Sequence, residues 1–258
     1  MPRIRIKSIP NSSFLIPNSF PPPLPFSLEI SYSKGMYIPL TRYGMPQVLI
    51  YPAVVLAIMA ALFVFMPRGI LLIIAEVALF LVFVWMLMFF RDPRREIKID
   101  SRALLSPADG TITDICETEI PELGKALRIG MFLSVFNVHI NRVPCRVRIE
   151  SVNYKKGKFK YANDAEASRV NESNDVLMAR LDGPQDRLLV RQVSGAIARR
   201  IVCEAKPARE YAQGEQYGMI KFGSRTELYL PYKEAGYDVA VKIGDRVNAG
   251  LSPLVIYR

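Results

Sequence analysis

A glycine followed by a serine near the C-terminus is the residue pair in this sequence with the clearest chemical potential. Gly223 and Ser224 lie in the segment FGSRTELYLP, between alternating apolar residues on either side, so the pair is expected to form a bend between two strands. The hydroxyl of a serine can attack the carbonyl carbon of the preceding residue, and a glycine there allows the backbone geometry that the attack requires. Because Gly-Ser is also a common turn sequence, an ordinary turn is the competing interpretation.

Two further side chains are candidates for acid–base chemistry. His139, the single histidine of the chain, lies in FNVHINRVP, and Asp109 lies in SPADG. Since histidine titrates close to neutral pH, a general base of the usual kind must be His139, although a lone histidine is often structural. An Asp before a Gly is normally a turn former. An Asp-His-Ser hydrolase triad is an alternative, but Ser224 has no G-x-S-x-G elbow around it and no helix signal after it.

Residues 96–258 must position these side chains, and their pattern is mostly β. Gly, Pro, Asn and Asp separate short runs of alternating apolar residues, at 111–116, 126–133, 147–152, 188–193, 226–230, 238–243 and 254–257. Residues 164–172 are less strand-like and are expected to form a loop or a short helix. The segments SPADG and KIGDRVNAG resemble pieces of barrel-sandwich domains, although the modified lysine of lipoyl and biotinyl carriers is missing. We therefore predict a mostly β (α+β) fold with a barrel-sandwich-like catalytic domain.

Two apolar runs precede this domain. Residues 48–66 and 70–90 are each close to the ~20 residues that cross a bilayer, and Pro67 and Gly69 break the helix between them. A hairpin buried in a protein core is the alternative, but two such runs in succession favour a transmembrane helical hairpin. Only Arg68 lies between the runs, whereas basic residues flank their outer ends, at Arg42, Arg91, Arg94, Arg95 and Lys98. The positive-inside rule therefore places the catalytic domain on the cytoplasmic side of the cell inner membrane.

The composition supports a membrane partner and defines three regions. A net charge of +10 suits attraction to anionic lipid headgroups, whereas no nucleic-acid partner is expected, because no helix-turn-helix or aromatic-basic motif is found. Three cysteines without metal-like spacing and one histidine predict reduced thiols and no metal site. Residues 1–35 are rich in proline and are expected to be disordered, with Met36 as an alternative start. The predicted regions are this extension, a membrane hairpin at 36–95 and a catalytic domain at 96–258.

Several motifs together make residues 36–258 similar to the phosphatidylserine decarboxylase family, in particular to its short bacterial subfamily. The hairpin is followed by motifs in the order expected for that family: FFRDPRR at 89–95, SPADG at 106–110, FLSVFNVHINRVP at 132–144, NESN at 171–174, QVSGAIARRIV at 192–202 and FGSRTELYLP at 222–231.

The resemblance implies a self-cleaving enzyme. In such enzymes the serine at the position of Ser224 attacks the carbonyl of the residue at Gly223, and the chain then breaks between them. The resulting chains, 1–223 and 224–258, stay together, and Ser224 becomes a covalent pyruvoyl group, the cofactor of the enzyme. Its ketone accepts electrons while phosphatidylserine in the membrane loses CO₂ and becomes phosphatidylethanolamine. A homo-oligomer is compatible with this interpretation.

The resemblance also suggests residue roles and leaves one open. Ser224, Gly223, His139 and Asp109 are assigned to the chemistry. Longer relatives carry H-x-x-H in the region of His139, and here Arg142 stands in the second place. Because arginine stays protonated, it cannot be a general base, so the base of self-cleavage is left open.

Three arginines are candidates for contacts with a substrate carboxylate or phosphate: Arg142, Arg199 and Arg200. Two other functions remain as alternatives. One is a related pyruvoyl decarboxylase that acts on another amino-acid derivative. The other is a membrane-tethered β-barrel adaptor without enzymatic activity, in which the Gly-Ser pair is an ordinary turn.

Overall fold

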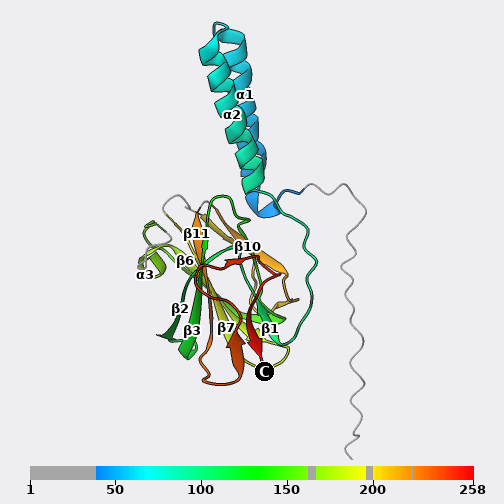
Figure 1. The fold of residues 1–258 in the computed structure, drawn as a ribbon, viewed down its shortest axis with the longest axis vertical. Helices are drawn as coiled ribbons and strands as arrows, with labels where there is room; N and C mark the ends of the chain where they lie inside the picture. Colours follow the sequence, from blue (N-terminus) through cyan, green and yellow to red (C-terminus); the bar gives the residue numbers. More distant parts are fainter. Residues whose placement is uncertain (1–38, 162–166, 196–199, 222) are drawn as a thin grey trace, which may run out of the picture. The chain divides into compact units, whose positions relative to one another are not determined.

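The computed structural model describes residues 39–161, 167–195, 200–221 and 223–258 (Figure 1). These residues belong to one compact unit that begins at Ile38. The proline-rich extension predicted at 1–35 lies outside the described residues. So does part of the predicted loop or short helix at 164–172, whose described part contains the short helix α3 (Ala167–Val170).

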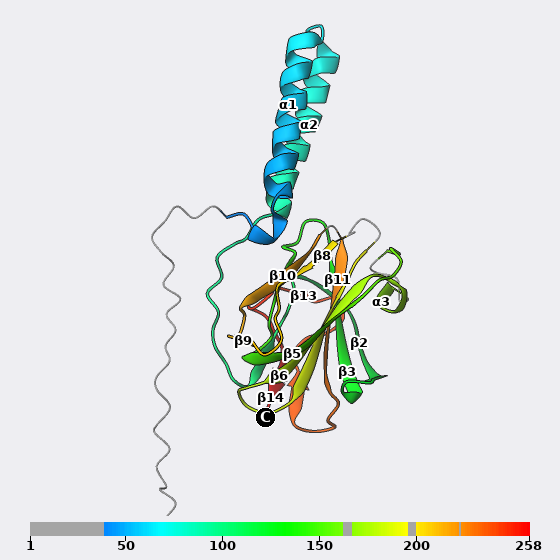
Figure 2. The ribbon, with the colours of Figure 1, turned by 180° about the vertical axis from the view of Figure 1, so that it is seen from behind.

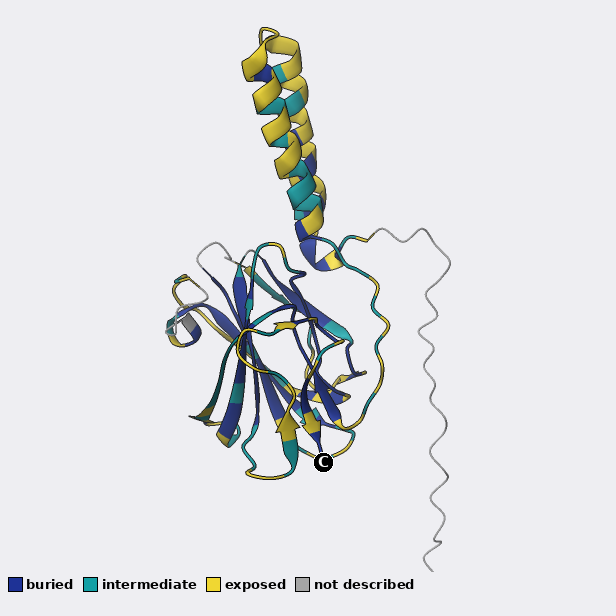
Figure 3. Cartoon of the chain, viewed as in Figure 1, coloured by how far each residue is buried: buried dark blue, intermediate teal, exposed yellow. Residues whose placement is uncertain are grey.

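Two long apolar helices lie side by side, α1 (Gln47–Phe65) and α2 (Ile70–Phe89), after a short 3₁₀ helix η1 (Arg42–Gly44) (Figure 1). Pro67 and Gly69 fall in the break between them, as their helix-breaking character predicts. In the described part of the chain, these are the two helices that are long and apolar enough to cross a membrane. Most of their apolar side chains are exposed (Figure 3), so the helices do not form a buried core hairpin, and they indicate membrane association.

The remainder of the described chain is mostly β, as predicted. Its first strands are β1 (Ala103–Leu105), β2 (Gly110–Ile120), β3 (Gly124–Leu133), β4 (Ile140–Arg142), β5 (Val147–Lys155), β6 (Ser173–Arg180) and β7 (Arg187–Val193). The later strands are β8 (Arg200–Cys203), β9 (Glu210–Tyr211), β10 (Gln216–Lys221), β11 (Ser224–Pro231), β12 (Tyr237–Val239), β13 (Arg246–Val247) and β14 (Pro253–Tyr257).

These strands form three antiparallel sheets among the described residues (Figure 2). The large sheet has the order β13-β2-β3-β11-β7-β6-β5-β9 and curls into a half-barrel. The smaller sheets have the orders β4-β10-β8 and β1-β14-β12. Strand β11 lies in the middle of the large sheet, where Ser224 pairs with Leu133 of β3 and Arg225 pairs with both Phe132 and Val193.

Strand β11 is buried on both faces. Leu228 belongs to the main apolar core, together with Ile129 of β3 and Val190 of β7. Tyr229 faces the other side, where it packs with Leu189 and other residues in a smaller cluster. Because one apolar cluster covers each face of β11, nearly every residue of the strand is buried, whereas a strand with one face in water would be half exposed.

The lower end of the helical hairpin packs on the small sheet that contains β4 and β10. Phe89 and Phe90, at the end of α2, form an apolar cluster with Val138, Ile140 and Met219. The Phe90 carbonyl also accepts a hydrogen bond of 2.8 Å from the backbone N–H of Thr41. The membrane helices therefore end directly against the strand that follows His139.

Candidate active site

The Gly223–Ser224 pair forms the bend between β10 and β11. Gly223 has a φ of +60°, in the left-handed region that side chains with a Cβ disfavour, so glycine suits this position. Ser224 is fully buried at the first position of β11, and its Oγ has no hydrogen-bond partner among the described residues. A buried hydroxyl without a partner is unusual in proteins, and Ser224 combines it with a place directly after a left-handed glycine, which makes Ser224 a functional candidate.

His139 is fully buried, and its imidazole ring is held from two sides. Its Nδ1 lies 2.9 Å from the carbonyl oxygen of Asn137, and the ring lies 4.5 Å from the Phe89 ring, centroid to centroid. Because a carbonyl oxygen only accepts, Nδ1 carries the hydrogen, and Nε2 keeps a free lone pair. Nε2 is buried and has no hydrogen-bond partner among the described residues.

Burial also sets the charge of His139. It lowers the pKa of the imidazole to about 4, and the opposing effects of the Asn137 carbonyl and the Asp109 charge do not offset it. The ring is therefore neutral at pH 7, with Nε2 ready to accept a proton.

A hydrogen bond between β4 and β11 brings Ser224 and His139 to the same end of the fold. Asn141 Nδ2 donates to Thr226 Oγ1 over 3.1 Å. Residues two apart on an extended chain point to the same face, so the side chain of His139 is expected on the same face as that of Asn141, and the side chain of Ser224 on the same face as that of Thr226. The His139 carbonyl accepts from the N–H of Ile220, which lies just before the β10–β11 bend, so His139 lies at the same end of these strands as the bend.

Buried amides continue this connection across the large sheet. Asn141 Oδ1 accepts from Gln192 Nε2 over 2.9 Å, and Gln192 Oε1 accepts from Asn174 Nδ2 over 3.0 Å. These three side chains, with Thr226, link β4, β11, β7 and β6. All four residues lie in motifs shared with the decarboxylase family, but their residue types alone predict no role for them. A row of buried, mutually bonded amides holds the strand after His139 against β11.

Asp109 is buried beside the site, but it has other partners. Its two carboxylate oxygens accept from Arg95 at 2.7 and 2.8 Å, and Oδ1 also accepts from the N–H of Ala249 over 2.7 Å. Gly110 follows it because a Cβ there would meet the Phe132 carbonyl oxygen at 2.4 Å. Since His139 Nδ1 bonds to Asn137, Asp109 acts on the imidazole through its charge and not through a hydrogen bond.

Arg95 is the site residue that the sequence reasoning missed. It belongs to the basic run after α2, which the sequence analysis assigns to membrane orientation. Its side chain is only 6% exposed and forms a two-bond ion pair with Asp109. Asp92 and Pro93 within this basic run could have indicated that the run packs on the protein, because a segment that only faces lipid headgroups does not need an acidic residue or a proline.

The three arginines predicted to contact substrate lie in different surroundings. Arg142 is buried, donates from Nη1 to the Gly214 carbonyl over 2.8 Å, and has Nη2 3.8 Å from Asp92 Oδ1. Arg200 is exposed on β8, and Arg199 lies outside the described residues. The structure does not bring Arg142 and Arg200 together, and a substrate contact of the three arginines stays a prediction.

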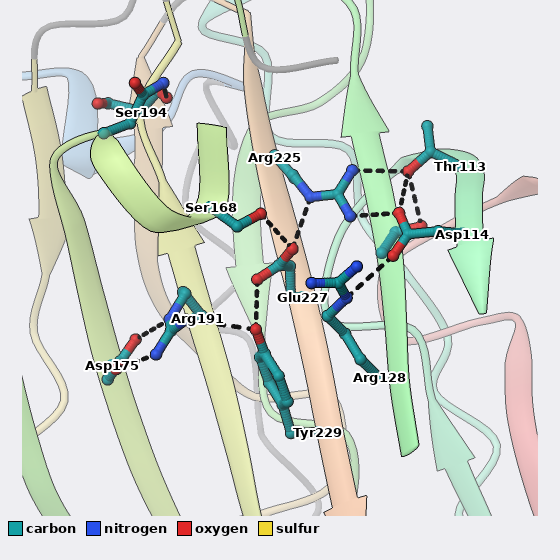
Figure 4. A network of polar contacts seen from close by, with 12 residues as sticks. Thr113, Asp114, Arg128, Ser168, Asp175, Arg191, Ser194, Arg225, Glu227 and Tyr229 are labelled. Atoms are coloured by element: carbon teal, nitrogen blue, oxygen red, sulfur yellow. Dashed lines mark hydrogen bonds and ion pairs between the residues drawn. The ribbon is translucent and has the colours of Figure 1, made fainter. Parts of the chain in front are cut away.

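The opposite face of β11 carries a buried polar network (Figure 4). Arg225 donates to Glu227 Oε1 over 2.7 Å, to Thr113 Oγ1 over 2.8 Å, and to Asp114. Glu227 also accepts from Tyr229 over 2.6 Å and from Ser168 of α3 over 2.5 Å. The network thus ties the strand that starts at Ser224 to β2 and to α3.

Glu227 stays ionised within this network. Its burial alone would raise the carboxyl pKa, but the charge of Arg225 and the hydrogen bonds from Ser168 and Tyr229 outweigh burial and hold the pKa below its usual value. A buried ion pair with all these bonds fixes the residue directly after Ser224.

The described residues thus combine a mostly β half-barrel, which carries a buried serine and a buried histidine, with two apolar helices that indicate membrane association, an architecture that suits a membrane-associated enzyme. The family model described as phosphatidylserine decarboxylase matches residues 82–254, and the chain belongs to this family. The similar curated proteins are each named phosphatidylserine decarboxylase proenzyme.

Three of these relatives illustrate the similarity. The protein from Carboxydothermus hydrogenoformans is 43% identical over 67% of this chain and 80% of its own. The protein from Rhodopirellula baltica is 39% identical over 86% of this chain and 89% of its own. The protein from Rickettsia typhi is 42% identical over 60% of this chain and 69% of its own.

Proposed function

We propose that this chain is a proenzyme that cleaves itself between Gly223 and Ser224 and then converts phosphatidylserine to phosphatidylethanolamine and CO₂. The observation that carries the proposal is that Ser224 Oγ at the β10–β11 bend and His139 Nε2 just before β4 are both buried without a hydrogen-bond partner among the described residues. The names of the relatives, which are proenzymes of phosphatidylserine decarboxylase, support the substrate and the processing.

Self-cleavage begins with the neutral imidazole of His139. Nε2 accepts the hydroxyl proton of Ser224, and Oγ bonds to the carbonyl carbon of Gly223. The peptide C–N bond breaks, the proton returns to the amine of Ser224, and an ester joins the two residues. The left-handed bend at Gly223 favours this attack, because no Cβ crowds the carbonyl.

Elimination then separates the two chains. A water molecule accepts the α-proton of Ser224, its Cβ–Oγ bond breaks, and Gly223 is released as a carboxylate. Water then hydrolyses the dehydrated residue left at position 224, whose nitrogen leaves as ammonia and takes up the proton released before, so a pyruvoyl group remains at the start of the 224–258 chain.

The residues around position 224 fit such a group. The group would supply a ketone that accepts the electron pair as the substrate carboxylate leaves as CO₂. Pairing of β11 with β3 holds position 224 opposite Leu133. His139 Nε2 then holds or returns the proton that the substrate carbon takes up, and Asp109, fixed by Arg95, stabilises that proton through its negative charge.

The membrane hairpin serves to keep the enzyme at its lipid substrate. The proposed orientation has both helix ends and the β domain on the cytoplasmic side of the inner membrane, because Arg68 is the one basic residue between the helices.

Intact-mass measurement of the purified protein tests the cleavage. The wild type should give two chains, 1–223 and 224–258, and Ser224→Ala should stay as one inactive chain, because it has no hydroxyl to attack with. Ser194→Ala is the matched control, since Ser194 Oγ is also buried without a hydrogen-bond partner among the described residues; it should still be cleaved. An active, uncleaved wild type would refute the proposal.

Lipid analysis tests the substrate. Vesicles that contain phosphatidylserine should gain phosphatidylethanolamine with release of CO₂. A cleaved protein that leaves phosphatidylserine unchanged but decarboxylates another amino-acid derivative would favour the related decarboxylase instead.

A further inference from the structure

A pocket of about 540 Å³ lies beside the candidate active site. Gly110 and Asn248, which adjoin Asp109 and Ala249 in the chain, form part of its wall, as does Asn137, whose carbonyl holds His139. Phe132 and Ser134 also line it, on either side of the residue that pairs with Ser224. The pocket therefore shares its walls with the residues that hold the site together.

The electrostatic character of the pocket is that of an anion site. Arg246 of β13 lines it, opposite Thr111 of β2, and the arginine is exposed. Within the described residues its guanidinium has no hydrogen bond or ion pair, and no Asp or Glu side chain is among those that line the pocket. An unpaired guanidinium beside hydroxyl and amide groups is suited to a phosphate or a carboxylate.

The rim of the pocket is tied to the end of the membrane hairpin. Phe136 lines the pocket and is 66% exposed, and its carbonyl accepts from Arg91 Nη2 over 2.7 Å. Arg91 also donates from Nη1 to the Met88 carbonyl at the end of α2 over 2.7 Å. A lipid headgroup that leaves the bilayer along the hairpin would thus meet this rim.

We propose that the pocket binds the headgroup of the phospholipid substrate, with Arg246 paired to its phosphodiester anion. This rests on the proposed function. The phosphodiester is the better partner because its charge persists through the reaction, whereas a guanidinium bound to the departing carboxylate would stabilise the ground state and oppose loss of CO₂. A contact that is equal in the ground and transition states acts on KM and not on kcat.

Arg246→Gln and Arg246→Lys test the assignment in neutral detergent micelles that contain dilute phosphatidylserine. Arg246→Gln should raise KM, expressed as mole fraction of lipid, roughly tenfold, the size expected for loss of one charge-assisted hydrogen bond. Its kcat and its self-cleavage should not change, and Arg246→Lys should recover part of the affinity. Arg102→Gln is the charge control, since Arg102 is exposed and pairs with Asp100 outside the pocket. An unchanged KM, or a loss confined to kcat, overturns the assignment.

Binding to the uncleaved Ser224→Ala protein separates this proposal from the proposed function. Glycerophosphoserine should bind, and glycerophosphocholine, which has the phosphodiester but no carboxylate, should compete with it, whereas free serine should not. Adding Arg246→Gln should weaken that binding roughly tenfold. Equal binding with and without Arg246, or competition by serine alone, overturns the pocket assignment even if the wild type cleaves itself and forms phosphatidylethanolamine.

Discussion

The imidazole of His139 lies against the Phe89 ring and bonds to the Asn137 carbonyl, and its burial lowers the pKa to about 4. Many enzymes tune a histidine with a directly bonded carboxylate, which would raise its pKa. Here the carboxylate of Asp109 is bonded to Arg95 instead. The site therefore keeps a neutral proton acceptor over most of the range in which proteins are stable.

The first prediction concerns the pH dependence of stability. The folded pKa of His139, about 4, lies below its unfolded value near 6.5, so its contribution to stability is present above pH 6.5 and is lost as the pH falls toward 4. Between pH 7 and pH 5 the loss should be about 2 kcal/mol. Thermal unfolding in detergent should therefore show a smaller fall for Ser224→Ala/His139→Gln than for Ser224→Ala. Parallel pH profiles for the two proteins would contradict the burial of a neutral ring.

The second prediction concerns Arg95. Arg95→Gln leaves the buried Asp109 carboxylate without its cation, a change that typically costs about 3–5 kcal/mol, so self-cleavage should slow by at least roughly tenfold. Lys98→Gln removes the same charge from the same basic segment at an exposed position and should cleave normally. The measurement is the fraction of cleaved chain on a gel over time. An equal effect of both changes would mean that the segment acts only through attraction to lipid.

At the scale of elements, strand β11 and the two apolar helices could be predicted from residue patterns, whereas strand β6 could not. A strand at 226–230 and the Gly-Ser bend before it could be predicted from the sequence, and each end of the two predicted apolar helices lies within one residue of the observed end. Strand β6 was not predicted because its residues SNDVLMAR show no regular alternation of polar and apolar types. The burial of its polar Asn174 depends on a hydrogen bond to Gln192 on another strand, which the local sequence does not reveal. Ser224, His139 and Asp109 could be chosen as candidates by residue type, and their roles stay predictions, whereas the Arg95–Asp109 ion pair depends on tertiary contacts that sequence spacing does not encode.

The third prediction concerns the network on the second face of β11. Glu227→Gln should lower the unfolding free energy by about 2–4 kcal/mol, because Arg225 loses its buried anion. Glu117→Gln is the matched control on β2, since Glu117 forms an exposed ion pair with Lys125, which water screens, and its loss should leave the unfolding free energy nearly unchanged. Thermal unfolding of both changes in the uncleaved Ser224→Ala protein measures the difference. Similar losses in the two variants would show that the network does not hold β11.

At the scale of the whole molecule, the two apolar helices and the candidate active site are in direct contact. The last turn of α2 supplies Phe89, which contacts His139, and the segment after it supplies Arg95, which binds Asp109. The hairpin is therefore expected to do more than tether the domain. Its end forms part of the wall around the imidazole of His139.

The fourth prediction concerns orientation. A reporter fused after Arg258 should behave as cytoplasmic, because basic residues flank the outer ends of the hairpin and Arg68 alone lies between the helices. A matched fusion placed at Arg68 should give the opposite result. Reporter activity on the outer side for the Arg258 fusion would overturn the proposed topology.

If the proposed self-cleavage cuts the chain before β11, the place of this strand in the middle of the large sheet has a further consequence. Strand β11, the first strand of the chain 224–258, would remain an inner strand of the sheet, bonded to β3 on one side and β7 on the other, but no peptide bond would join it to the chain 1–223. Folding is then an event that each molecule completes only once, as a proenzyme. A mature enzyme that unfolds would have to find its second chain by diffusion, so its recovery would depend on concentration, and its lifetime would be set by the rate of unfolding.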